Sequence, residues 1–417
     1  MRHNRLPMFA VLRHIPFRNL WLGQAISEAG NAFYFVTFMF MAGKLTNSSA
    51  TVGYVGAAET LPFLLLGPYA GVVADRFDRR QIMLLSDLGS ALVLLLFGAC
   101  VLLGIASSIP VLLAVAFALS AVRVFFNPAK TAAIPDLAPP DQLVAANALS
   151  SATRNFMQMA GLGASAGILA ALYALYPTGF FLGAVIVNAL SFLGSAYYVW
   201  LLPTLLPPEK EPAHPWTEFT QGLDYVKGRR DLVVLILLLA LFRLFVAPFW
   251  VFYYAANEAW FGGKPSTLAF FEFSFVVGMV IGSALMGRAK PKRPAIWFIV
   301  GLGLSGLPVI AMAYTRDIVA FSLWNFACGI LIPVGDIPLA TYLQQSVPST
   351  YRGRVSSVEG TFATGVMPIG MGLGGRIQEA IGTLMGFVLI GLGMTGSCLL
   401  GLLDRTFRRI RLDPSAL

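Results

Sequence analysis

Long apolar runs recur along the whole chain and constrain its fold more than any other feature. A helix needs about 20 mostly apolar residues to cross the hydrocarbon core of a bilayer. Twelve such runs lie at 18–42, 51–74, 81–104, 109–134, 144–172, 179–202, 231–256, 267–288, 295–314, 317–346, 354–382 and 383–403. The pattern predicts an all-α membrane protein with twelve transmembrane helices.

The composition agrees with a multi-pass membrane protein. The chain is 57% hydrophobic and 12% charged, which leaves too few polar residues to cover a water-soluble surface. Its net charge of +9 is typical of basic cytoplasmic loops, so we expect no nucleic-acid partner. The first run is longer than the core of a signal peptide and is interpreted as a retained span.

The distribution of lysine and arginine predicts the orientation of the spans. If the N-terminus is inside, most of the 29 basic residues fall on the cytoplasmic side. Only Lys44, Lys264, Arg316 and Arg376 fall on the outer side. The positive-inside rule therefore places both termini in the cytoplasm, and the expected location is the inner membrane of a bacterium.

A proline-rich polar stretch divides the spans into two sets of six. It predicts an N-terminal half at 1–202, a cytoplasmic linker at 203–230 and a C-terminal half with a short tail at 231–417. An amphipathic piece, Phe219–Tyr225, predicts one surface helix in the linker. The prolines of the stretch are Pro203, Pro207, Pro208, Pro212 and Pro215.

The two halves contain similar segments, as a six-plus-six repeat predicts. Ser150-Ser151 opens the fifth span and Ser356-Ser357 opens the eleventh. The loop after the second span reads Gly71-x-x-x-Asp75-Arg76-x-x-Arg79-Arg80. The loop at 287–293 is a degenerate copy that lacks the acidic residue.

These features resemble the major facilitator superfamily. Asn127-Pro128-Ala129-Lys130 and Arg352-Gly353-Arg354-Val355 make the chain similar to its multidrug and macrolide efflux branch. The resemblance implies a proton-coupled exporter of amphipathic, drug-like molecules that acts by alternating access, as a monomer. Export of lysophospholipids or other lipids by a flippase mechanism, and siderophore export, are alternatives within transport.

The sequence gives little support to an enzyme, sensor or cofactor protein. The three cysteines lie in apolar runs and the three histidines lie outside them, so we expect no metal site. No nucleotide-binding loop of the Gly-x-x-x-x-Gly-Lys-Ser/Thr type occurs, and we expect no cofactor. The loops show no catalytic cluster, so a polytopic enzyme or sensor is the weakest alternative.

Charged residues inside spans are candidates for proton coupling or substrate binding, because burying a charge in a membrane is costly. Gln24, Glu28 and Asn31 form one stripe along their helix, and Ser120, Arg123 and Asn127 form another. The residues predicted on this basis are Glu28, Asn31, Glu59, Arg123, Asn127, Arg243, Glu272 and Asp336.

Three interpretations of Glu28 stay open. Its carboxylate could carry a proton, form a permanent ion pair with Arg123, or contact the substrate. Arg123 could act on a neighbouring group, bind an anion, or simply bridge helices. Glu59 and Glu272 stand alone on apolar backgrounds; an outer-cavity role or a preference for cationic substrates is possible for Glu59.

The resemblance also implies a conformational latch at the cytoplasmic side. Asp75 would meet the start of the eleventh span when that side is closed, where helix N–H groups favour a carboxylate. Glu359 is predicted one turn into that span, where it would cap the helix and help to form the gate. Exporters of the family carry Gly-Pro within the fifth span, and the stretch 160–167 here keeps glycines but lacks the proline. Export stays the expectation, and the case for obligate antiport is weaker. The predicted latch residues are Gly71, Asp75, Arg76, Arg79, Arg80, Gly353, Arg354 and Glu359.

Overall fold

A computed structural model of the chain describes residues 8–106, 108–176, 179–206, 215–287, 289 and 291–412. Within these residues the chain forms helices and turns, with no strand. Helices are what apolar segments must form in lipid, because each backbone N–H and C=O has to be satisfied within the segment. Nine segments of the described chain are long and apolar enough to cross a membrane.

Each predicted span overlaps a helix, but the count of twelve is not established by these nine segments. The helices at the predicted spans 18–42 and 144–172 are not among the nine, and Thr350–Leu402 combines the last two predicted spans. The twelve crossings and the cytoplasmic termini therefore stay predictions.

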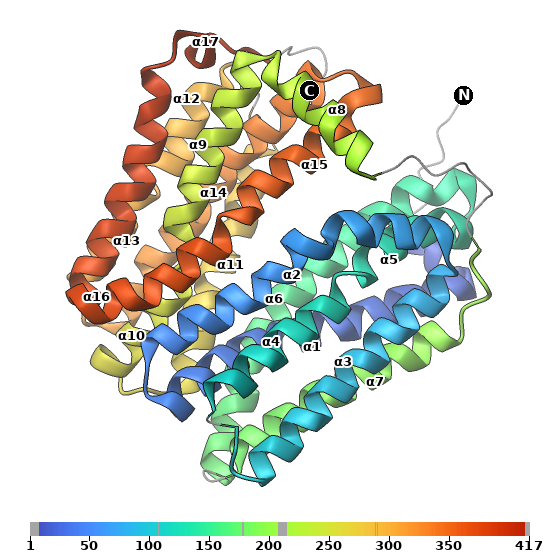
Figure 1. Cartoon of the computed structure of the whole chain (residues 1–417), viewed down its shortest axis with the longest axis vertical. Coiled ribbons are helices and arrows are strands. Elements are labelled where there is room, and N and C mark those ends of the chain that lie inside the picture. Colours follow the sequence, from blue (N-terminus) through green and yellow to red (C-terminus); the bar gives the residue numbers. More distant parts are fainter. Residues whose placement is uncertain are drawn as a thin grey trace. The chain divides into compact units, whose positions relative to one another are not determined.

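The chain divides into two compact units, which we describe separately (Figure 1). The first comprises the described residues of Met1–Met41 and Leu65–Pro212, and the second those of Ala42–Leu64 and Ala213–Leu417. This division differs from the predicted halves in assigning the short segment 42–64 to the second unit. Two helices, α1 (Ile15–Thr46) and α2 (Ser49–Arg76), run through both sets of residues.

The first unit is a helical bundle in which α3 and α7 run side by side (Figure 1). Its core at one end includes Phe17, Met83, Ala129, Ala133 and Val199, all of which are almost fully buried. Besides parts of α1 and α2, its elements are η1 (Met8–Arg13), α3 (Arg79–Leu102), α4 (Ile109–Arg123), α5 (Phe126–Leu137), η2 (Pro140–Gln142), α6 (Leu143–Leu175) and α7 (Phe180–Trp200).

The second unit contains the remaining helices. They are α8 (Pro215–Lys227), α9 (Arg230–Val246), α10 (Phe249–Trp260), α11 (Pro265–Met286), α12 (Pro294–Phe298), η3 (Ile299–Gly303), α13 (Gly306–Ala313), α14 (Ile318–Ser346), α15 (Ser349–Gly365), α16 (Met367–Leu399), η4 (Leu400–Leu402) and α17 (Arg405–Arg408). The predicted surface helix of the linker is confirmed as part of α8, which packs on α15. Residues 207–214, with three of the linker prolines, and Arg288 and Lys290 of the degenerate loop lie outside the described residues.

Glycines allow α11 and α14 to pack closely in the second unit. A Cβ atom added at Gly278 or Gly282 would collide with the backbone of α14, and one at Gly329 would collide with the backbone of α11. Small residues at a helix crossing let two backbones approach each other, which is a common device in membrane bundles. The interface therefore depends on the absence of side chains at these positions.

Several predicted spans are interrupted rather than continuous. The span predicted at 231–256 is broken at Pro248, where proline removes a backbone donor, and the one at 295–314 contains the π-helical turn η3. The eleventh predicted span begins earlier than expected, at Ser349, and breaks between α15 and α16. Gly382, with a φ angle of 79°, turns the chain between the last two predicted spans.

Candidate functional site

The first unit holds a buried ion pair between α1 and α5. The Nζ atom of Lys130 lies 3.6 Å from Oε1 of Glu28, and the two side chains are 4% and 18% exposed. The charge of Arg154, on α6, also acts on Lys130. Lys130 is thus a site residue that was not among the predicted candidates, and it is the ion-pair partner of Glu28.

Hydrogen bonds between α1 and α6 support this pair from one side. Gln24 donates to the backbone oxygen of Ser150 at 2.8 Å and accepts from the hydroxyl of the same residue at 2.7 Å. The indole of Trp21 donates to the hydroxyl of Thr153 at 2.6 Å. Polar groups buried in an apolar setting persist when they satisfy one another. The predicted stripe on α1 therefore begins with a residue that fixes α1 against α6.

A second buried carboxylate lies deeper in the first unit. The hydroxyl of Ser195, on α7, donates to Oδ2 of Asp87, on α3, at 2.6 Å. Asp87 is 1% exposed, and the charge of Arg123 acts on it. Arg123 also lies 5.8 Å from the ring centre of Tyr34, within the range of a cation–π interaction. Asp87 was not predicted, although it is an acidic residue inside a predicted span.

The other predicted polar residues of the first unit are less involved. Asn31 is half-buried, and its side-chain oxygen has no hydrogen-bond partner among the described residues. Asn127 is exposed at the surface of the first unit. The predicted stripe of Ser120, Arg123 and Asn127 therefore contributes chiefly through Arg123.

The second unit brings three charged residues together. The charge of Arg243, on α9, acts on both Asp336 and Glu359, and the two carboxylates act on each other. Within the described residues, Nε of Arg243 has no hydrogen-bond partner. The predicted position of Glu359 near a helix start is wrong, because α15 begins at Ser349 and Glu359 lies in its middle. Glu359 consequently belongs with the charged cluster rather than with a helix cap.

The two remaining acidic candidates also lie in the second unit. The charge of Glu272, on α11, acts on Tyr253, whose hydroxyl donates to the side-chain oxygen of Asn325. Asn325 in turn donates to the backbone oxygen of Phe271 at 2.5 Å. Glu272 is therefore next to a buried polar group, and not on a wholly apolar background as the sequence predicts. Glu59 is half-buried on α2.

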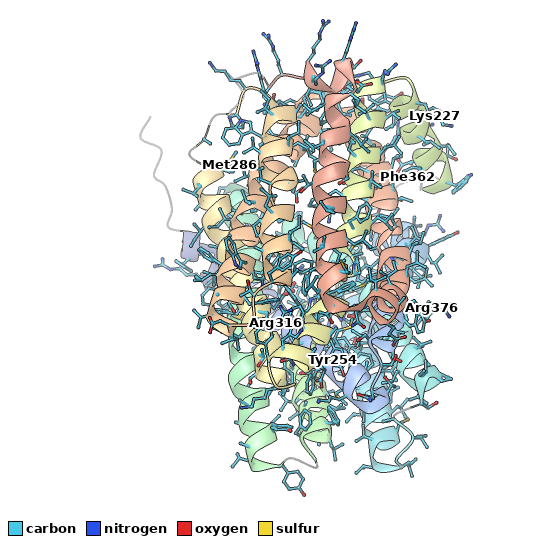
Figure 2. The ribbon with its side chains drawn as sticks, turned by 90° about the vertical axis from the view of Figure 1, so that its left-hand side faces the viewer. Lys227, Tyr254, Met286, Arg316, Phe362 and Arg376 are labelled. Carbon is cyan, nitrogen blue, oxygen red and sulfur yellow. The ribbon has the colours of Figure 1, made fainter. Side chains whose placement is uncertain are left out.

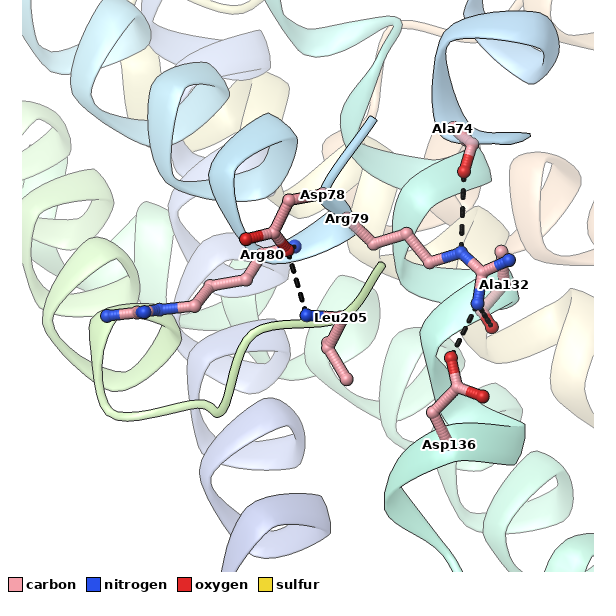
Figure 3. A network of polar contacts seen from close by, with 7 residues as sticks. All are labelled: Ala74, Asp78, Arg79, Arg80, Ala132, Asp136 and Leu205. Atoms are coloured by element: carbon pink, nitrogen blue, oxygen red, sulfur yellow. Dashed lines mark hydrogen bonds and ion pairs between the residues drawn. The ribbon is translucent and has the colours of Figure 1, made fainter. Parts of the chain in front are cut away.

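The motif that follows α2 is organised by two acidic residues that the sequence interpretation did not single out (Figure 3). Arg79 donates to Oδ2 of Asp136 at 2.5 Å and to the backbone oxygens of Ala74 and Ala132. Asp78 accepts from the backbone N–H of Arg80 and from that of Leu205, each at 3.0 Å. These contacts tie α2, α3 and α5 to the segment after α7.

The predicted latch residues differ in exposure, and Gly71 and Arg80 are half-buried. Arg79 is buried in the network above, whereas Asp75 and Arg76 are exposed. In the second unit, Gly353 is exposed and Arg354 lies 3.9 Å from the carboxylate of Glu218. Arg79 therefore has a structural role within the first unit, and the latch function of the others stays a prediction.

A set of polar contacts in the second unit ties the segment 42–64 to α10 and α16. Lys44 pairs with Glu258 at 2.8 Å. Glu379 accepts from the hydroxyl of Ser48 at 2.8 Å and from the N–H of Ala50 at 3.0 Å. Arg376 donates to the hydroxyl of Tyr54 at 2.5 Å. In Figure 2, Arg316 and Arg376 lie toward the opposite end of this unit from Lys227, and which end faces outward stays a prediction.

Comparisons with known proteins agree with the fold and with the motifs. The model of the Major Facilitator Superfamily matches residues 20–371. The MFS-type transporter YfiS of Bacillus subtilis (strain 168) is 29% identical over 386 residues, or 89% of each chain. Macrolide efflux protein A of Streptococcus pyogenes is 24% identical over 390 residues, which cover 90% of this chain and 93% of that protein.

A solved structure shows the same fold. The crystal structure of the nucleoside transporter NupG superposes with a TM-score of 0.72 at 12% identity, over 94% of this chain and 99% of that chain. Its low identity makes this a likeness of fold alone. The family model covers well over half of the sequence and residues of both units. The chain therefore belongs to the Major Facilitator Superfamily of multi-pass membrane transporters.

Proposed function

We propose that the protein is a proton-coupled exporter of amphipathic small molecules that works by alternating access. The similarity to macrolide efflux protein A supports export of drug-like compounds. In transporters of this kind, two halves rock about a central site, so that the site opens to one side of the membrane at a time. Proton coupling requires an ionisable group whose protonation changes its contacts.

The ion pair of Glu28 and Lys130 is the observation that carries the proposal. A proton that reaches Glu28 neutralises the carboxylate and releases its attraction for the ammonium group 3.6 Å away. Arg154 then acts on a lysine that has lost its nearest negative charge. Loss of the proton restores the pair. Each cycle of protonation thereby changes the interaction between α1 and α5, two elements of the first unit.

Replacing the carboxylate tests this role directly. Glu28→Gln should abolish macrolide accumulation driven by a pH gradient in liposomes containing the purified protein. Exchange of labelled for unlabelled macrolide, which requires no net proton movement, should persist. Asp224→Asn, on the exposed face of α8 and ion-paired, within the described residues, only with Lys227 of the same helix, is the matched control and should behave like the parent. Proton-driven accumulation that survives in Glu28→Gln would remove Glu28 from the coupling mechanism.

A second candidate function is the export of anionic chelators such as siderophores. The observation that favours it is the surplus of cations around the first-unit site. Arg123, Lys130 and Arg154 carry positive charge there, against the carboxylates of Glu28 and Asp87. The same liposomes distinguish the two functions if a macrolide and a ferric carboxylate siderophore are compared. Preferential transport of the siderophore would favour the second candidate.

A further inference from the structure

A cavity lined by arginine side chains lies where the C-terminal tail meets the start of α9. Its volume is about 510 Å³, within the usual range for small-molecule sites. The lining comes from three parts of the second unit: the start of α9, the end of α14, and the tail that includes α17. The charged and phenolic side chains that line it are Arg229, Asp231, Tyr342, Arg405, Arg409 and Arg411.

Asp231 supplies the one carboxylate of this arginine cavity, and both of its oxygens accept hydrogen bonds from residues of the cavity. Arg229 donates to both oxygens of Asp231, at 2.9 and 2.7 Å, and the hydroxyl of Tyr342 donates to the same group at 2.6 Å. This bidentate contact raises the pKa of Arg229 above its ordinary value. Within the described residues, Arg405, Arg409 and Arg411 form no ion pair. Four guanidinium groups and one carboxylate leave three positive charges in the cavity.

The tail that carries these arginines is held in place by buried anchors. Phe407 is fully buried, with its ring centre 5.6 Å from that of Phe298, and Ile410 and Leu412 are nearly buried. The N–H of Leu412 donates to the backbone oxygen of Lys292 at 3.1 Å. Anchoring lowers the entropy that the arginines lose when they bind a ligand. The charges are therefore positioned on an ordered segment.

Asp404 fixes the start of this tail. Its carboxylate pairs with Arg230 at 2.8 Å and accepts from the N–H groups of Thr406 and Phe407. The hydrogen bond from Phe407 is the main reason why the pKa of Asp404 lies below its ordinary value. This contact places Arg405 directly after the last apolar helix.

The chain next to the cavity offers apolar surface of the kind that acyl chains cover. Leu399, Leu400, Leu402 and Leu403 are 45%, 48%, 44% and 78% exposed, and they immediately precede Asp404. An exposed row of leucine at the end of a membrane helix contacts lipid tails, while the arginines that follow lie at headgroup level. Arginine binds phosphate through paired N–H donors. A ligand that joins a phosphate to acyl chains matches both features.

We propose that the arginine cavity binds the headgroup of an anionic phospholipid, with its phosphate on Arg405, Arg409 and Arg411 and its acyl chains along the adjacent leucines. Basic pockets at the cytoplasmic end of membrane helices are suited to such headgroups. The predicted orientation, with the C-terminus inside, places the cavity at the cytoplasmic leaflet. The site is separate from the charged clusters that the transport proposal uses.

Native mass spectrometry of the detergent-purified protein tests the site. One molecule of dioleoyl phosphatidylglycerol should bind to the protein more tightly than any further molecules of that lipid. Dioleoyl phosphatidylcholine should bind more weakly than this first molecule. Arg409→Gln should weaken phosphatidylglycerol binding about tenfold, because it removes a charge-assisted contact. Arg408→Gln is the matched control, since Arg408 is the exposed neighbour that does not line the cavity, and it should change binding less than twofold.

Further experiments distinguish binding at this site from general attraction between charges and from binding of soluble anions. Arg411→Gln is a second variant on the tail and should also weaken phosphatidylglycerol binding. All variants that are compared should have the melting temperature of the parent in lipid-free detergent. Equal losses in Arg408→Gln and Arg409→Gln would contradict a defined site. Competition by inorganic phosphate or glycerol 3-phosphate at the concentration of the lipid would also overturn the lipid assignment.

Discussion

Lys130 is the residue whose position most changes the interpretation of the first unit. Its side chain is 4% exposed and lies 3.6 Å from Glu28. Removing one partner of a buried pair leaves an uncompensated charge, whereas removing both does not. Lys130→Gln should therefore lower the free energy of unfolding by about 3 kcal/mol. The double variant Glu28→Gln/Lys130→Gln should recover most of that loss in denaturation experiments in detergent. Additive losses would show that the two residues do not interact.

The hydrogen bond between Asp87 of α3 and Ser195 of α7 also leads to a prediction about stability. Ser195→Ala removes the hydroxyl that donates to the buried carboxylate at 2.6 Å. Loss of this hydrogen bond leaves a buried carboxyl group without its partner and should destabilise the protein by about 1–3 kcal/mol. Ser191→Ala is the control on the same helix, because the hydroxyl of Ser191 donates to the local backbone oxygen of Asn188. Similar melting temperatures for the two variants would contradict a stabilising role for the Ser195 contact.

The sequence predicts some of these residues and not their partners. Periodicity along α1 identifies Gln24 and Glu28, whereas the predicted stripe through Arg123 and Asn127 does not include Lys130. The chain is not one continuous helix there, because α4 ends at Arg123 and α5 begins at Phe126. Asp87 meets the criterion of an acidic residue inside a predicted span, but its partner Ser195 is far along the chain and could not be predicted. Which charges pair depends on how helices cross, and the spacing within one helix does not contain that information.

At the scale of helices, close packing of α11 on α14 makes a specific prediction. Gly329→Leu places a side chain against the backbone of α11, where even a Cβ atom would collide. Such overpacking should destabilise the protein by about 1–3 kcal/mol or more. Gly396→Ala is the control in α16, since a Cβ atom there meets nothing within 4 Å. Its melting temperature should equal or slightly exceed that of the parent, because alanine favours a helix. An unchanged melting temperature in Gly329→Leu would contradict the tight crossing.

The apolar runs predict where helices lie better than where they break. Pro248 gives a sequence signal for the break between α9 and α10, because proline cannot donate a backbone hydrogen bond. The π-helical turn at Ile299–Gly303 has no equivalent signal in the hydropathy of the sequence. The early start of α15 at Ser349 also escapes hydropathy, because its first turns are polar. That early start explains why the predicted position of Glu359 is wrong.

At the scale of the whole molecule, alternating access requires contacts that break and form again. The ties of segment 42–64 to α16 are candidates, with Glu379 accepting from Ser48 and Ala50. Glu379→Gln should weaken these ties and expose a reporter cysteine introduced as Ala57→Cys, a residue close to Gly372 of α16. The measurement is the rate of thiol labelling from the outside, with the three native cysteines replaced by serine and Asp224→Asn as control. An unchanged labelling rate would show that Glu379 does not hold this side closed.

Coupling of transport to protons is the central claim, and one measurement tests it most directly. The purified protein is reconstituted in liposomes, a pH gradient is imposed, and uptake of a labelled macrolide is recorded together with internal pH. Coupled export predicts that the macrolide accumulates above its external concentration, that this accumulation collapses when a protonophore is added, and that adding macrolide accelerates proton movement. Macrolide movement that only equilibrates across the membrane, and that is the same with and without the gradient, would contradict proton-coupled export.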